Sequence, residues 1–311
     1  MTAEKVVLWN AGAGSAARSE TAQRQLALQP GTKVIVTHSA EDARQATLQA
    51  LKTGIREILV AGGDGSINTI GEQIIRSGCH DTVLSILPIG TGNDLARELG
   101  IPLDPVEAVE MLTAAPVRRI DAIDVEFEGG RRIALNTFSA GNTGKYTQAL
   151  TAEEKERWGA WCFVRGAIDV LQDLECYELT VQEQDGAPFQ IEVLNLFLAN
   201  GPGSGGGLMV APPARLNDGL LDLVAICDGP PLDIAELAAS YMLGDFLDHE
   251  LVVHRRVTGL KLQSTRPLAG AIDGLELEGS RFSLQLLPAV LQVRCAPNAP
   301  ALLPVRQEVT G

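Results

Sequence analysis

Two glycine-containing segments of this chain carry residue types that could bind phosphate. The first, GGDGSIN, occupies Gly62–Asn68 and follows the apolar run at residues 58–60. The second, PIGTGND, occupies Pro88–Asp94 and follows a predicted strand at residues 82–87. Glycine lets a ligand approach the backbone closely, and a helix that begins just after such a turn points its first N–H groups at one spot. The two segments therefore predict phosphate binding by strand–turn–helix units.

The two most common nucleotide loops do not fit these segments. The sequence contains no Walker A motif, and Gly12-Ala13-Gly14 lacks the third glycine of the dinucleotide fingerprint. Asn93 or Asp94 alone could be explained as a helix N-cap. The whole second string, next to the first, favours ligand binding over simple capping.

Strand and helix patterns alternate through roughly the first 115 residues, as expected for a layered α/β domain. The predicted strands are Lys5–Trp9, Lys33–Val36, Ile58–Val60 and Thr82–Leu87, and the predicted helices between and after them include Arg18–Leu28, Glu41–Lys52 and Pro105–Leu112. We expect an α/β N-terminal layered domain with a mostly parallel sheet. The suspected loops all follow strands, so they should meet at the carboxyl edge of that sheet.

The pattern changes after residue 117 to short strands separated by Gly, Pro, Asn and Asp, which is typical of an antiparallel β-sandwich. The strands are expected at 120–127, 132–138, 178–184, 190–199, 220–227, 256–263 and 280–287, with helices at 153–174 and 232–247. We therefore predict a nucleotide-binding domain at residues 1–120 and a C-terminal antiparallel β-sandwich domain at 121–290. The Pro-rich tail, about 290–306, is a candidate to return to the first domain.

The composition excludes several functional classes. Lys and Arg number 25 against 39 Asp and Glu, so the net charge is −14. Such an acidic chain is a poor partner for nucleic acid and for tight electrostatic docking on anionic lipid. The five cysteines are scattered and form no CxxC pair, which predicts neither a zinc site nor a disulfide framework. We expect no signal peptide, no membrane-spanning segment and a cytoplasmic location. Peripheral contact with a membrane is compatible with a cytoplasmic location.

With both glycine segments in view, the chain resembles the diacylglycerol kinase catalytic-domain superfamily, which includes soluble bacterial lipid kinases and sphingosine kinases. Gly62–Asn68 is similar to its nucleotide loop and Pro88–Arg97 to its P-x-G-T-x-N-D-x-A-R signature. The run from Asn200 to Asp222 resembles its N-G…G-G-G…A-P…D-G-x-x-D segment. The resemblance implies an ATP-dependent kinase that phosphorylates a hydroxyl of diacylglycerol or a related lipid in an interdomain cleft.

The resemblance also implies roles for individual residues. Mg²⁺ would be bound by the Asp218 carboxylate and the backbone of Arg215 and Leu220. It implies a diacylglycerol-like lipid as partner and no nucleic acid. Transient membrane contact and a homodimer are both compatible with the resemblance. The residues implied to bind the nucleotide are Asn10, Thr37, Gly62, Gly63, Asp64, Gly65, Ser66, Asn68, Gly90, Thr91, Asn93 and Asp94.

The catalytic motif of the resembled family, D-G-E, is altered in this chain. Asp273 and Gly274 match, but Leu275 stands where a glutamate base is expected. Three hypotheses remain open: Asp273 serves as the base with help from Asp64, Glu276 reaches in instead, or phosphoryl transfer is weak or lost. A loose transition state asks little of a base, so turnover without the glutamate is chemically reasonable. A further alternative is an NAD kinase, which also uses a G-G-D-G sequence, although Pro88–Arg97 is not its signature.

Overall fold

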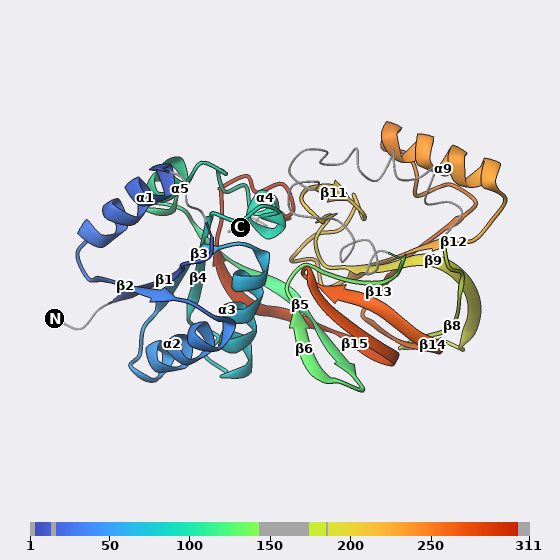
Figure 1. Ribbon diagram of the computed structural model, residues 1–311, viewed down its shortest axis with the longest axis horizontal. Helices are drawn as coiled ribbons and strands as arrows, with labels where there is room; N and C mark the ends of the chain where they lie inside the picture. The colour runs from blue at the N-terminus through green and yellow to red at the C-terminus, as the bar shows by residue number, and fades with distance from the viewer. Residues whose placement is uncertain (1–3, 14–16, 143–173, 185, 304–311) are drawn as a thin grey trace, which may run out of the picture. The chain divides into compact units, whose positions relative to one another are not determined.

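The computed structural model describes residues 4–13, 17–142, 174–184 and 186–303 (Figure 1). The chain divides into two compact units, which we describe separately. Unit 1 comprises Met1–Ala122, Arg215–Gly219 and Pro288–Gly311, and unit 2 comprises Ile123–Ala214 and Leu220–Leu287. The sequence did not foresee the short return of Arg215–Gly219 to unit 1. The helix expected at 153–174 lies outside the described residues.

Four parallel strands form the centre of unit 1. β1 (Lys5–Asn10) pairs with β2 (Thr32–Thr37) and with β3 (Glu57–Gly62), and β3 pairs with β4 (Val83–Pro88). The side chains in the middle of β1, β3 and β4 are almost fully buried, as in a sheet covered on both faces. Near the C-terminus, Gln292 and Val293 add a further parallel pairing to β4.

Helices cover both faces of this sheet (Figure 1). α1 (Ala17–Leu28) packs beside α5 (Pro105–Leu112), and α2 (Ala40–Lys52) packs beside α3 (Asp64–Arg76). α3 buries isoleucines at helical spacing, which fixes it against β3. The short α4 (Asp94–Glu98) follows β4. Both α3 and α4 therefore begin at the carboxyl ends of neighbouring strands.

Unit 2 is built from antiparallel strands around an apolar core, and a second, smaller apolar cluster lies between α9 and the strands β9 and β12. Two long strands, β5 (Val117–Phe127) and β15 (Leu275–Arg294), have one end in each unit. The other strands are β6 (Gly130–Ala134), β7 (Thr137–Gly141), β8 (Tyr177–Glu183), β9 (Phe189–Ala199), β10 (Gly203–Ser204), β11 (Leu208–Met209), β12 (Leu221–Cys227), β13 (Val252–Val257) and β14 (Gly259–Ile272), and the described helix of this unit is α9 (Pro231–Leu243).

β7 and β8 lie end to end at the same strand position of the sheet, between β9 and β14. β7 pairs with one part of β9 and with the end of β14. β8 pairs with another part of β9 and with the start of β14.

The two-domain arrangement and the β-rich C-terminal domain agree with the expectation from the sequence. Within the residues that the structure describes, the strands pair mostly antiparallel, and the parallel pairs are confined to β1–β4 and to β15 with β4. The single strand expected at 132–138 is wrong: it breaks at Leu135 and Asn136, because their backbone N–H groups donate to the Asp273 carboxylate. None of the described helices is long and apolar enough to cross a bilayer.

Candidate active site

The carboxyl ends of β1, β2 and β3 are linked by side chains that the sequence had singled out. Asn10 ends β1 and donates from Nδ2 to Ser66 Oγ in the first turn of α3, at 2.9 Å. Asn10 Oδ1 accepts the N–H of Gly12, which shapes the loop after β1. Thr37 pairs with Asn10 in the sheet and is buried, with its hydroxyl donating to the Trp9 carbonyl. These three strand ends therefore form one ordered edge.

The two glycine segments touch each other through their backbones. A Cβ placed on Gly90 would lie 2.3 Å from the Gly63 Cα, so no larger residue fits there without moving the chain. A Cβ on Gly62 would lie 2.7 Å from the Ser66 Cβ. The glycines at 62 and 90 are thus required by close approach of the loop after β3 to its neighbours.

Asp64 ties the second segment to the first. Its Oδ2 accepts the N–H of Asn93 at 2.8 Å and its Oδ1 accepts the N–H of Asp94 at 2.9 Å. Asn93 has a left-handed backbone (φ 56°), and its side chain both donates to and accepts from the backbone of Gly90. The Asp64 carboxylate therefore orders the turn into α4, in addition to any contact with a ligand.

The residues expected to bind nucleotide all lie at this edge of unit 1 or just behind it. Thr91 is exposed, whereas Asn68 is fully buried in α3 and can act only through its neighbours. The N-cap of α3 is Gly63, which makes no side-chain hydrogen bond, and Gly65 lies in the first turn of the helix. A helix start next to bare glycine backbone is suited to binding the negative charge of a phosphate.

A second loop of unit 1 carries the residues expected to bind a metal. Asp121 Oδ2 accepts the N–H of Gly219 at 2.9 Å, Oδ1 accepts that of Ala289 at 2.6 Å, and the Asp121 N–H donates to the Leu216 carbonyl at 2.6 Å. Burial raises the pKa of Asp121, the two N–H donors oppose this, and the charge of Asp218 adds to it. Asp121 thus fixes the fold of the Arg215–Gly219 loop.

The donor set of that loop fits a hard divalent cation. Asp218 offers a carboxylate, and Arg215 and Leu220 offer backbone carbonyls, so every expected donor is oxygen, as magnesium prefers. Arg215 and Asp218 lie in unit 1, and Leu220 is the first residue of the next segment of unit 2. Among the described residues no group of three or more His, Cys, Asp or Glu side chains could hold a metal by itself.

The altered D-G-E motif lies at a tight hairpin of unit 2. Asp273 (φ 47°) and Gly274 (φ 81°) form the two-residue turn between β14 and β15, where positive φ at both positions favours Asp-Gly. The Asp273 carboxylate accepts the backbone N–H groups of Leu135, Asn136 and Thr137 at 2.7, 3.0 and 2.8 Å. These three donors fix the orientation of the Asp273 carboxylate and tie the β14–β15 turn to residues 135–137.

The structure places the other candidate base on the solvent side of its strand. Glu276 is exposed, whereas Leu275 before it is half-buried and pairs with Ile272 across the turn. Successive residues of a strand face opposite sides, so the side chains of Leu275 and Glu276 lie on opposite faces of β15. Asp273 contacts the 135–137 turn, and the role of Glu276 as a base stays a hypothesis.

Comparisons with known proteins agree with this arrangement. The family model "Diacylglycerol kinase catalytic domain" matches residues 5–125, and the model "YegS C-terminal NAD kinase beta sandwich-like domain" matches residues 137–295. A Pseudomonas putida relative named "Probable lipid kinase YegS-like" is 31% identical over 270 residues, which covers 86% of this chain and 87% of the relative. The chain belongs to the diacylglycerol kinase catalytic-domain family. A second relative of the same name, from Stenotrophomonas maltophilia, is 29% identical over 280 residues. The match covers 87% of this chain and 88% of that relative.

Solved structures show the same fold as this family member. A crystal structure of a "putative diacylglycerol kinase" from Bacillus anthracis superposes with a TM-score of 0.81 at 21% identity and covers 96% of both chains. Another Bacillus anthracis structure, described as a diacylglycerol kinase, has a TM-score of 0.70 at 18% identity and covers 96% of this chain and 98% of its own. At these identities the likeness establishes the fold alone.

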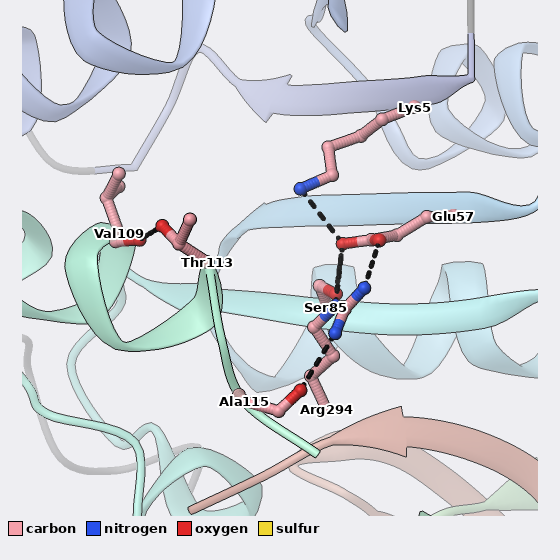
Figure 2. A network of polar contacts seen from close by, with 7 residues as sticks. All are labelled: Lys5, Glu57, Ser85, Val109, Thr113, Ala115 and Arg294. Atoms are coloured by element: carbon pink, nitrogen blue, oxygen red, sulfur yellow. Dashed lines mark hydrogen bonds and ion pairs between the residues drawn. The ribbon is translucent and has the colours of Figure 1, made fainter. Parts of the chain in front are cut away.

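One polar network of this kinase-family chain was not foreseen from the sequence. The Glu57 carboxylate accepts from Lys5 at 3.0 Å, from Ser85 at 2.8 Å and from Arg294 at 3.1 and 2.8 Å, and Arg294 also donates to the Ala115 carbonyl (Figure 2). Burial alone would raise the pKa of Glu57, but the Arg294 hydrogen bond, the Lys5 charge and the Ser85 bond together lower it. The network lies near the amino ends of β1, β3 and β4 and fixes the carboxyl end of β15 to the sheet of unit 1.

A buried carboxylate in unit 2, the last residue of the run from Asn200 to Asp222, was given no role of its own from the sequence. Asp222, almost fully buried on β12, bonds His254 Nε2 on β13 at 2.7 Å. The signal was present in the sequence, because Asp222 is a lone charge inside an apolar strand pattern. A buried charge of this kind normally has a partner; here His254 lies nearest, and Arg256 Nε lies 3.9 Å from the other carboxylate oxygen.

Proposed function

We propose that the chain is an ATP-dependent lipid kinase whose acceptor is the hydroxyl of diacylglycerol or a related lipid. The observation that carries the proposal is the coupling of the two glycine segments by Asp64, in a chain of this family. Coupled loops at a helix start form a rigid phosphate cradle, and phosphoryl transfer depends mainly on such positioning.

The residues of this chain would divide the work as follows. Backbone N–H groups around Gly63 and Gly90 would hold phosphate oxygens, with the start of α3 adding its positive dipole end. Asp218 and the carbonyls around it would hold Mg²⁺, which supplies charge neutralisation when bound. Asp64 and Asp121 would act through the loops that they order.

The test is an assay with γ-labelled ATP, Mg²⁺ and a panel of hydroxylated lipids, including diacylglycerol, with extraction and identification of the labelled product. We expect label in a phosphorylated lipid. NAD is included as a second acceptor. Formation of NADP without any labelled lipid would overturn the proposal in favour of an NAD kinase.

A second function, that of a catalytically impaired nucleotide-binding relative, is favoured by one observation. Leu275 cannot accept a proton, and Asp273 already accepts three backbone N–H groups. Measurement of ATP binding alongside turnover separates the two functions. ATP binding with no labelled lipid from any acceptor would support the impaired relative, whereas steady turnover would exclude it.

A further inference from the structure

The exposed large apolar side chains of unit 2 are concentrated in one place. Among the described residues of this unit, those that are exposed are Met209 on β11 (45% exposed) and Leu232, Met242 and Leu243 on α9 (77%, 54% and 85%). Isolated exposed apolar residues are normal, but a group on one element indicates a binding surface.

α9 is apolar on two opposite sides. Its inner side, Ile234, Leu237 and Tyr241, packs against a core cluster that includes Val224 of β12 and Phe197 of β9. Leu232 and Leu243 are eleven residues apart, which is about three helical turns, so they lie on the same side of the helix, opposite the inner one. We define the α9 outer face as Leu232, Ala235, Ala239, Met242 and Leu243, all of which are exposed.

The helix that carries this face is fixed in place. Tyr241 accepts a hydrogen bond from the backbone of Met209, and its ring centroid lies 5.1 Å from that of Phe246. The helix ends at Gly244 in the left-handed conformation that closes a helix (φ 79°). Figure 1 shows α9 lying across β12 and β9. The outer face is thus presented by a rigid element and not by a loop.

The charges around α9 decide what could cover it. Between residues 228 and 250 there is no Lys or Arg, and the six carboxylates are Asp228, Asp233, Glu236, Asp245, Asp248 and Glu250. A second copy of the chain would bring like charges together, and an anionic bilayer would repel them. A zwitterionic surface with an apolar interior accepts the outer face without either cost.

We propose that the α9 outer face docks on a zwitterionic phospholipid bilayer by inserting Leu232, Met242 and Leu243 below the headgroups. The choice of a bilayer rests on the proposed function, because a diacyl lipid acceptor resides there. Apolar side chains on one helical face are sufficient for interfacial binding when enough of them are buried together. Binding of this kind depends weakly on salt, unlike docking through basic residues.

The test is co-sedimentation of the full chain with pure phosphatidylcholine vesicles, without ATP or acceptor lipid. We expect binding that Leu232→Gln, Met242→Gln and Leu243→Gln together weaken by at least about tenfold. Leu28→Gln is the matched control, since Leu28 is 84% exposed but lies in unit 1, and it should bind as the wild type does. Glu236→Leu removes an exposed carboxylate one turn after Leu232, beside the outer face, and should strengthen binding.

Three results would overturn the proposal: no binding of the wild type to these vesicles, equal binding of the triple variant, or a concentration-dependent dimer that the triple variant abolishes. Size-exclusion chromatography of both proteins measures the last. A kinase assay on detergent-dispersed lipid separates this proposal from the proposed function. If the wild type binds vesicles, the triple variant does not, and neither protein shows kinase activity, the proposed function is contradicted and the docking surface is supported.

Discussion

The Asp64 carboxylate accepts the backbone N–H of Asn93 at 2.8 Å, across the space between the loops after β3 and β4. The same carboxylate accepts the N–H of Asp94, so one side chain at the start of α3 fixes the start of α4. The sequence analysis assigned Asp64 to nucleotide binding and to proton transfer. The structure adds a role that needs neither, which is to hold the two glycine segments in one geometry.

Asp64→Asn should reduce kinase turnover by at least about a hundredfold, because the asparagine NH₂ group cannot accept the N–H that one carboxylate oxygen now accepts. kcat and KM for ATP are measured with γ-labelled ATP, and folding is checked by thermal unfolding. Asp104→Asn is the control, since Asp104 also accepts two backbone N–H groups, but as the cap of α5, where asparagine serves as well. Undiminished turnover of Asp64→Asn would contradict the assignment.

Features that depend on neighbouring residues could be predicted from the sequence, and features that depend on distant residues could not. Gly62–Asn68 and Pro88–Asp94 each lie between a strand pattern and a helix pattern, so their meeting at one edge of the sheet was predictable. The hydrogen bonds of Asp273 were not predictable, because its partners at 135–137 lie far away in the chain. Seen alone, Asp-Gly before an apolar strand suits a catalytic motif and a type I′ turn equally well.

The ion pair of Glu57 with Arg294 and the return of Arg215–Gly219 to unit 1 also depend on residues that lie far apart in the chain. Glu57 and Arg294 are 237 residues apart, and nothing in the local pattern of either residue points to the other. The return of Arg215–Gly219 to unit 1 depends on Asp121 and Ala301, which bind Leu216 from both sides. Such contacts are products of tertiary structure and have no periodic signal in the sequence.

Glu57→Gln should lower the free energy of unfolding by about 3 kcal/mol at pH 7, because it leaves Arg294 and Lys5 without their carboxylate. The pKa of Glu57 is lowered in the folded state, so its stabilisation is complete above the unfolded pKa of about 4.3 and is lost as pH falls through the folded value. Urea unfolding of both proteins from pH 7 down to about 3 measures this difference.

The control for that experiment is Glu20→Gln. Glu20 pairs with Arg24 at 3.8 Å on the surface, where both side chains are largely exposed. Its loss should change stability by less than about 0.5 kcal/mol at any pH. A Glu57→Gln deficit that persisted undiminished at pH 3 would show that the network stabilises by packing and not by charge.

Asp121→Asn should raise the magnesium concentration needed for half-maximal activity by about fivefold or more, because one of the two N–H donors of Gly219 and Ala289 loses its acceptor and the Arg215–Gly219 loop relaxes. Magnesium titrations at saturating ATP measure this. The matched control is Asp124→Asn, three residues along the same strand, where the carboxylate pairs with Arg131 and does not reach the loop. Identical magnesium titration curves for the wild type and Asp121→Asn would contradict a metal site in this loop.

Leu275→Glu should raise kcat by at least about tenfold if the chain lacks only a proton acceptor, because position 275 follows directly on the Asp273-Gly274 turn. The pH profile should then gain an acidic limb that the wild type lacks. Leu275→Gln has the same size and polarity without the charge, so it should leave kcat unchanged. Equal rates for the Glu and Gln variants and the wild type would mean that transfer proceeds without a base here, as a loose transition state allows.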